Sequence, residues 1–200
     1  MIQYISEFFK KNLRLIAIIG VLIILIFGFY EFYNYLNLKK IKNTSRNYFE
    51  AIENININNS KSISILEEIS KTKNGYSILS SMDLAKIHID KKDYNKAYDI
   101  YTKLIDSKID KLYKEIVIIH SSYNLINKVD KEMISSLINR VDIDKSSFKS
   151  HLYEIKYINS IDKINIVELN NLNIKIQSDI EILPSVKERI KSINEYIQNK

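Results

Sequence analysis

The stretch that decides the fold runs from residue 75 to residue 109 and reads GYSILSSMDLAKIHIDKKDYNKAYDIYTKLIDSKI. Its apolar side chains recur at helical spacing on both sides of a short polar break at residues 91–93. A connection this short forces the two flanking helices to pack antiparallel. The stretch therefore predicts a helical hairpin, with helices near residues 76–90 and 94–107.

This hairpin resembles a tetratricopeptide repeat, a unit of about 34 residues in which two antiparallel helices approach closely through small side chains. If the unit begins at Ile78, the residues that match the packing positions of the repeat are Leu84, Ala85, Tyr94, Ala97 and Tyr101. The match is incomplete, because Ser81 stands where the repeat has tryptophan and Ile109 where it has a closing proline. Since one repeat cannot bury its own face, the resemblance implies further hairpins beside it.

The rest of the chain also predicts helices. Only Gly75 and Pro184 represent glycine and proline after residue 28, which is too little turn chemistry for a protein built from strands. Apolar spacing predicts helices near residues 43–56, 60–71, 112–127, 130–140, 146–159, 163–177 and 184–198. We therefore expect an all-α protein with an irregular, tetratricopeptide-like stack of hairpins and a C-terminal capping helix.

An apolar run precedes this domain. Residues 15–30, LIAIIGVLIILIFGFY, carry no charge. With its flanks the run predicts a helix over about residues 13–36, which at about 1.5 Å per residue crosses the roughly 30 Å core of a bilayer. The main alternative is a cleaved secretory signal, but Phe29, Tyr30 and Phe32 place bulky rings where a signal peptidase requires small side chains. An uncleaved transmembrane anchor is therefore favoured.

Positive charge concentrates around the anchor. Residues 1–46 hold seven Lys or Arg against two Glu, a net charge of +5, and the other 154 residues hold 23 basic and 22 acidic side chains, a net charge of +1. The balance of the domain gives no support for a nucleic-acid surface. The expected organisation is a basic N-terminal segment at 1–12, an anchor helix at 13–36, a basic juxtamembrane linker and helix at 37–59, and the helical domain at 60–200.

Charge also bears on orientation. Lys10, Lys11 and Arg14 lie directly against the apolar run, whereas Lys39 to Arg46 lie two turns or more beyond it. Because positive charge next to a span favours the cytoplasmic side, we expect a cytoplasmic N-terminus and an exported domain. The chain has no cysteine, which is compatible with either side.

Motifs of catalysis are missing from the sequence. It contains no cysteine nucleophile, no glycine-rich phosphate loop and no H-E-x-x-H pattern. The three histidines are His88, His120 and His151, and their spacing places them in successive hairpins, too far apart to share one metal ion. We therefore expect no enzyme activity, no catalytic residue, no cofactor, no metal site and no small-molecule substrate.

The basic-flanked anchor, the one recognisable repeat and the divergent hairpins after it, in a chain of 200 residues, are similar to the tetratricopeptide-like family that includes the ancillary subunit of the bacterial Sec translocon. The resemblance implies a single-pass inner-membrane protein with a periplasmic helical domain. It also implies a scaffold for protein–protein interactions at the export machinery, with the Sec translocon and periplasmic chaperones as partners. The alternative is a membrane-anchored adaptor for cell division or envelope assembly, facing the cytoplasm.

The resemblance also indicates a binding surface, because the first helix of each hairpin in such repeats lines a concave groove. By the repeat alignment the residues that face this groove are Leu79, Met82, Lys86 and Ile89. The competing interpretation is that the three apolar residues of this set pack in the core.

Overall fold

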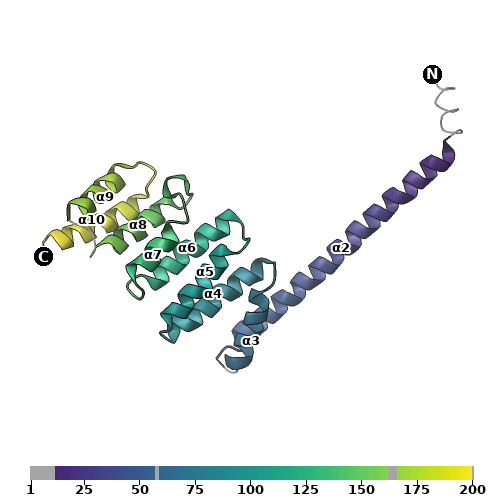
Figure 1. Cartoon of the computed structure of the whole chain (residues 1–200), viewed down its shortest axis with the longest axis horizontal. Helices are drawn as coiled ribbons and strands as arrows, with labels where there is room; N and C mark the ends of the chain where they lie inside the picture. The colour runs from purple at the N-terminus through teal and green to yellow at the C-terminus, as the bar shows by residue number, and fades with distance from the viewer. Residues whose placement is uncertain (1–11, 57–58, 162–165, 200) are drawn as a thin grey trace, which may run out of the picture. The chain divides into compact units, whose positions relative to one another are not determined.

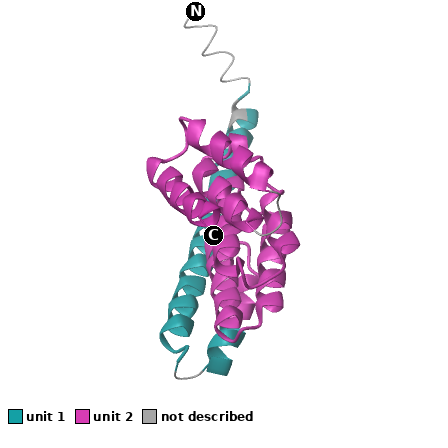
Figure 2. Cartoon of the chain, turned by 90° about the vertical axis from the view of Figure 1, so that its left-hand side faces the viewer, with its two compact units in different colours: residues 1–65 teal, residues 66–200 magenta. Residues whose placement is uncertain are grey.

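The fold is described by a computed structural model that covers residues 12–56, 59–161 and 166–199. Regular secondary structure within these residues is entirely helical, which confirms the predicted all-α class. The chain divides into two compact units, residues 1–65 and residues 66–200 (Figure 2). Most of the predicted basic segment at 1–12, with Lys10 and Lys11, lies outside the described residues.

The first unit consists mainly of one long helix, α2 (Leu13–Glu53), of 41 residues. At about 1.5 Å per residue it is about 60 Å long, twice the roughly 30 Å core of a bilayer. The segment Ala17–Glu53 contains a window with a mean hydropathy of 1.9, and none of that window is buried. By length and composition this helix suits a membrane span or an N-terminal signal sequence, and its exposure is unlike that of a core helix.

The second half of α2 is a polar continuation of the apolar half. The helix runs without a break through residues 37–42, where the sequence has no glycine or proline to end it. It ends at Glu53, and the amide of the Asn54 side chain donates a hydrogen bond of 2.8 Å to the carbonyl of Glu50. The next helix, α3 (Asn59–Ser70), begins in the first unit and ends in the second.

The second unit is a succession of helices in which each packs on the next (Figure 1). After α3 they are α4 (Gly75–Asp90), α5 (Tyr94–Asp106), α6 (Lys111–Leu125), α7 (Lys131–Ile138), the short 3₁₀ helix η1 (Ile143–Lys145), α8 (Lys149–Ser160), α9 (Ile166–Ser178) and α10 (Pro184–Gln198). The helices predicted near 76–90 and 94–107 are confirmed as α4 and α5. The helix predicted at 130–140 is shorter than expected, because the chain leaves α7 after Ile138. The helix predicted from 163 is observed from Ile166, since residues 162–165 lie outside the described part.

Local sequence explains how the hairpins begin and turn. The side-chain oxygens of Asn74 and Asp110 accept hydrogen bonds of 3.0 and 2.8 Å from backbone N–H groups in the first turns of α4 and α6. Lys92 and Asn127 have φ values of 61° and 62°, in the left-handed region, just after α4 and α6. These tight reversals let each pair of neighbouring helices return antiparallel.

Two apolar clusters form the core of the second unit. The first lies among α4 to α8 and has at its centre Ala85, Ala97, Tyr101, Ile105, Val117, Ile118, Leu125, Ile134, Leu137, Leu152 and Ile155. The second lies among α8, α9 and α10 and consists of Tyr153, Tyr157, Leu169, Ile176, Ile182, Val186 and Ile190. Adjacent residues of α8 therefore enter different clusters, so this helix joins the two clusters into one stack.

Candidate protein-interaction surface

The residues of the repeat signature meet inside the α4–α5 hairpin. Leu84, Ala85, Ala97 and Tyr101 are buried, and Tyr94 is half-buried against the same cluster. The two alanines are fully buried on facing helices, and a small side chain on each lets the backbones approach. The hydroxyl of Tyr101 lies 3.1 Å from Nδ1 of His120, which links this hairpin to α6.

The four residues expected in the groove divide between two environments. Leu79 is 44% exposed and Lys86 is exposed, whereas Met82 and Ile89 are half-buried and pack against the first cluster. The division follows from helix geometry, since Leu79 and Lys86 are seven residues apart and share one direction from the axis. Met82 and Ile89 lie about 60° or more around the helix from that direction, on the side that packs against the first cluster.

An apolar stripe on α6 extends this exposed side. Leu112, Ile116 and Tyr123 are 49%, 37% and 38% exposed, and their spacing of four and seven residues places them on one side of the helix. We call one group of exposed and half-buried side chains on these two helices the first-helix face. It consists of Leu79, Asp83 and Lys86 of α4 and Leu112, Ile116, His120 and Tyr123 of α6, of which Asp83 and His120 are half-buried. Sequence patterns did not single out these α6 residues, because apolar spacing within a helix does not tell which side the neighbouring helices cover.

Contacts and charges place the two halves of the first-helix face together. Helices α4 and α6 pack against each other. Burial lowers the pKa of His120, the negative charge of Asp83 opposes this shift, and the positive charge of Lys86 adds to it. These charges act across the helix pair, so Asp83 and Lys86 lie near His120. The face therefore presents apolar side chains with a few charged groups among them, which is the usual composition of a protein-binding patch.

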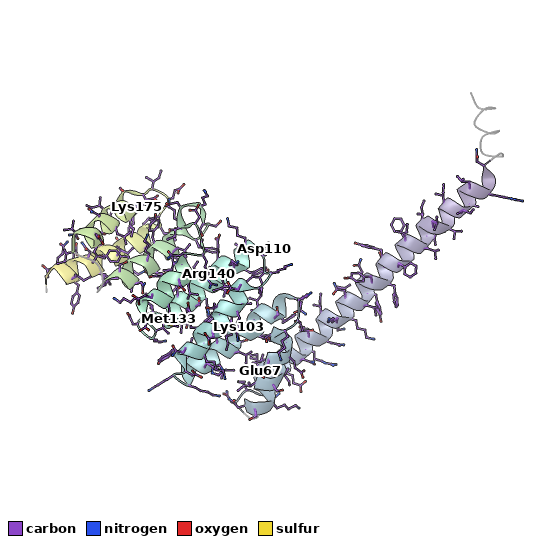
Figure 3. All side chains as sticks on the ribbon, in the orientation of Figure 1. Glu67, Lys103, Asp110, Met133, Arg140 and Lys175 are labelled. Atoms are coloured by element: carbon purple, nitrogen blue, oxygen red, sulfur yellow. The ribbon has the colours of Figure 1, made fainter. Side chains whose placement is uncertain are left out.

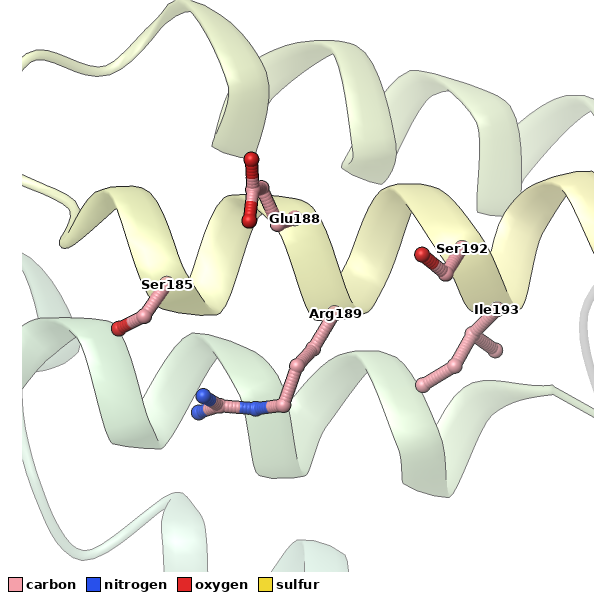
Figure 4. A pocket seen from close by; sticks show the side chains of 5 residues that line it. All are labelled: Ser185, Glu188, Arg189, Ser192 and Ile193. Carbon is pink, nitrogen blue, oxygen red and sulfur yellow. The ribbon is translucent and has the colours of Figure 1, made fainter.

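A polar network connects the first-helix face to α8 and α10 through Tyr123. The Tyr123 hydroxyl donates a hydrogen bond of 2.6 Å to Oε2 of Glu154, whose carboxylate also receives bonds of 2.6 and 2.7 Å from Nε and Nη2 of Arg189. Figure 4 shows the Arg189 side chain reaching from α10 toward the neighbouring helix, beside a shallow hollow lined by Ser185, Glu188, Ser192 and Ile193. Glu154 is buried, with 4% of its surface exposed. Sequence patterns gave no signal for this network, because its members are far apart along the chain.

The network sets the ionisation of its carboxyl group. Burial alone would raise the pKa of Glu154, but the hydrogen bonds from Arg189 and Tyr123 outweigh it and leave that pKa below its ordinary value of 4.5. Burial and the bond to Glu154 raise the pKa of Tyr123. At neutral pH the site is therefore a carboxylate bound by a guanidinium and a neutral phenol.

The three histidines occupy separate places in the stack. Nδ1 of His88 lies 3.3 Å from Asp93, His120 contacts Tyr101, and Nδ1 of His151 lies 3.5 Å from the Tyr123 hydroxyl. Each ring therefore has a neighbour of its own, which is Asp93 in the turn after α4, Tyr101 of α5 or Tyr123 of α6.

Comparison with known proteins gives one match. A family model described as a tetratricopeptide repeat-like domain matches residues 6–154, which include α2 and the hairpins up to α8. No curated protein and no solved structure matches the chain.

Proposed function

The chain belongs to the family of tetratricopeptide repeat-like domains, which generally mediate protein–protein interactions, and from this we propose that it is a membrane-anchored scaffold at the protein-export machinery. In this proposal α2 anchors the chain in the inner membrane, with the N-terminus in the cytoplasm. The helical domain lies in the periplasm and docks the Sec translocon and periplasmic chaperones. The chain acts by binding and catalyses no reaction.

The observation that carries the proposal is the exposed apolar stripe on the first-helix face. Leu112, Ile116 and Tyr123 expose large side chains on a helix whose opposite side is fully buried. Apolar side chains gathered on one exposed side favour contact with another macromolecule. The face belongs to the domain and not to the anchor, which suits a scaffold that presents a docking surface beside other membrane proteins.

The length of α2 supports the same role. Its apolar part is sufficient to cross a bilayer, and the polar part from about residue 37 to Glu53 continues the helix by about 25 Å at 1.5 Å per residue. A helix that spans and then continues in water leaves the domain tethered at the membrane. Arg14 flanks the apolar part on its N-terminal side and favours a cytoplasmic N-terminus there.

A fusion of alkaline phosphatase to the C-terminus tests the anchor and its orientation. We expect an active fusion that remains in the membrane fraction after an alkaline wash, because the enzyme matures only in an oxidising compartment. Activity in the soluble periplasmic fraction would instead mean that the apolar helix is a cleaved signal. A stable but inactive fusion would contradict the periplasmic location and favour the cytoplasmic adaptor of division or envelope assembly.

Photo-cross-linking in cells tests the docking surface. With a photoreactive residue at Leu79, we expect adducts with a translocon subunit or a periplasmic chaperone. The variant Leu112→Glu with Ile116→Glu should lower the adduct yield by about fivefold or more, since placing charge in an apolar contact costs a binding site at least about 1 kcal/mol. The yield is read by immunoblotting and the adducts by mass spectrometry.

The matched control for this variant is Ile166→Glu with Ile174→Glu, which adds two charges at apolar positions of α9 that are 63% and 64% exposed and lie outside the face. Its adduct yield should equal that of the unmodified protein. An equal loss of adduct yield in both variants would contradict the first-helix face as the docking surface. Adducts confined to division or envelope-assembly proteins would leave the face intact and overturn the export role.

A further inference from the structure

Helix α2 has an exposed basic surface at the point where its apolar part ends and its polar part begins. The helix passes through this point without a break, so its side chains keep fixed directions there (Figure 1). At about 100° per residue, positions 35, 39, 42 and 46 lie within an arc of about 60° on one side of the helix. We call the residues at these positions the basic stripe; they are Tyr35, Lys39, Lys42 and Arg46.

The basic stripe lies opposite the packed side of α2. Thr44 and Ala51 are buried, with 8% and 1% of their surface exposed. They point about 150–170° away from the middle of the stripe. The four stripe residues are all exposed, and Tyr35 is 61% exposed. The stripe is therefore open to a molecule outside the chain.

Positive charge on the stripe is not balanced by nearby acids. Between Phe32 and Phe49 the sequence has four basic residues and no acidic one, the fourth basic residue being Lys40. In the part of the chain that the structure describes, none of these four forms an ion pair. The nearest acids along the helix are Glu31 and Glu50, about one turn outside either end of the stripe. The stripe therefore suits an anionic ligand.

The position of the stripe along the span indicates the kind of anion. A hydrocarbon core of roughly 30 Å that begins at Leu15 ends about 20 residues later, at Tyr35. Lys39 and Lys42 then lie about 6 and 10 Å beyond the core, and the headgroup layer is about 5–8 Å thick on each side. Lysine side chains reach back toward a membrane surface from such positions. The anions at this depth are the phosphates of lipid headgroups.

The spacing within the stripe suits a phosphate group. Tyr35, Lys39 and Lys42 are four and three residues apart, so neighbouring side chains on this side of the helix can contact the same headgroup. The phenol donates a hydrogen bond, and the ammonium groups form charge-assisted hydrogen bonds to the phosphate oxygens. A zwitterionic headgroup brings a cation of its own into this basic surface, whereas an anionic headgroup does not. The stripe therefore favours lipids with a net negative charge.

From this complementarity we propose that the basic stripe binds anionic phospholipids in the leaflet at the C-terminal end of the span. Lys39 and Lys42 pair with the headgroup phosphate, and the Tyr35 hydroxyl donates to it at the edge of the core. Arg46, about 16 Å beyond the core, adds a weaker attraction that salt screens. This inference goes beyond the proposed scaffold and rests on its membrane anchor alone. The first-helix face takes no part in it, so protein docking and lipid binding can fail separately.

Native mass spectrometry of the full chain tests the site. The protein is released from micelles that contain equal amounts of phosphatidylglycerol and phosphatidylcholine with the same acyl chains, and lipid adducts are identified by mass. We expect phosphatidylglycerol adducts to outnumber phosphatidylcholine adducts by about tenfold or more, with a ratio that falls as salt is added. The variant Lys39→Gln with Lys42→Gln should lower this ratio by about fivefold or more, since two charges that attract the headgroup are removed.

Two controls separate the stripe from net charge. Lys156→Gln with Lys191→Gln makes the same change of charge on exposed lysines of α8 and α10, and should leave the ratio within about twofold of the original. Lys39→Gln alone should lower the ratio more than Lys40→Gln alone, because these neighbours lie at nearly the same depth but point about 100° apart. Circular dichroism should show the same helix content for all variants.

Flotation with phosphatidylcholine vesicles after an alkaline wash tests the anchor separately. Protein that stays with the vesicles but binds the two lipids equally would overturn the lipid site and leave the anchor intact. Protein that leaves the vesicles would overturn the anchor, and the lipid site with it.

Three further results would overturn the stripe as a lipid site. The first is an equal loss of the ratio in the control with both domain lysines changed, and the second is an equal loss in Lys39→Gln and Lys40→Gln. The third is the mass of a dimer in place of lipid adducts, which would assign the stripe to a second copy of the chain.

Discussion

Truncation of Tyr101 to alanine is expected to lower the free energy of unfolding by about 3–5 kcal/mol, because the removed ring leaves a cavity in the core. Tyr101 has no exposed surface, and its ring packs edge-to-face on His120 with the ring centres 5.8 Å apart. A loss of this size is a large part of the roughly 5–15 kcal/mol that stabilises a typical domain. Urea denaturation of the full chain in detergent, followed by circular dichroism, measures it.

The variant Tyr101→Phe separates the ring from its hydroxyl. It keeps the packing and removes only the contact of 3.1 Å with Nδ1 of His120, so the expected loss is about 1 kcal/mol. A loss of unfolding free energy below about 1 kcal/mol for Tyr101→Ala would contradict the position of Tyr101 at the centre of the stack. Burial and the charge of Asp83 raise the pKa of Tyr101, so its hydroxyl stays neutral over the pH range of such measurements.

The second large effect is expected for Arg189→Met. Methionine keeps the apolar stem but removes the guanidinium, and the carboxylate of Glu154, whose side chain is 6% exposed, is left with Tyr123 alone. Breaking a buried ion pair costs about 3–5 kcal/mol, and we expect about 2–3 kcal/mol because half of the Arg189 side chain is in solvent. The double variant with Glu154→Gln should recover much of this loss, since no unpaired charge remains.

Arg140→Met provides the matched control. Arg140, labelled in Figure 3, pairs with Asp106 at 2.6 Å, but 61% of the Asp106 side chain is exposed. An exposed pair of this kind contributes about 0–1 kcal/mol. Equal losses for Arg189→Met and Arg140→Met would contradict the buried network.

The pH dependence gives a second readout of the Arg189 variant. The pKa of Glu154 is lowered in the folded protein, so its stabilising effect is present above the ordinary value of 4.5 and is lost as the pH falls through the folded pKa. Without Arg189, burial raises this pKa, and protonation then favours the folded variant. The difference in the free energy of unfolding between the two proteins should therefore begin to narrow above pH 4.5, where Glu154 of the variant takes up its proton, and should narrow further below pH 4.5, where the native ion pair is lost.

Much of the fold follows from local sequence. The helical spacing of residues 75–109, the break at 91–93 and the small residues Ala85 and Ala97 predict the α4–α5 hairpin as the structure has it. The apolar run at 15–30 predicts the long exposed helix in the same way. These features depend on residues a few positions apart, so sequence alone determined them.

Only the tertiary structure decided which side of each helix stays exposed. Leu79 and Met82 are both apolar and lie on the same helix, yet Leu79 is 44% exposed and Met82 packs against the core. On α6, Leu112 and Ile116 are apolar and recur at helical spacing, but no helix in the described part of the chain covers them fully. The exposed side depends on where the neighbouring helices lie, and periodicity within one helix does not contain that information.

The burial of the Glu154 carboxylate also depends on residues that are distant in the sequence. A glutamate within an amphipathic helix is ordinarily assigned to solvent, but Glu154 is buried because Arg189, 35 residues away in sequence, and Tyr123, 31 residues away, hydrogen-bond its carboxylate. Sequence by itself thus determined the helices and their hairpin, because those depend on local spacing. The stacking of hairpins decided the surfaces and the polar network, because burial and ion pairing depend on neighbours far along the chain.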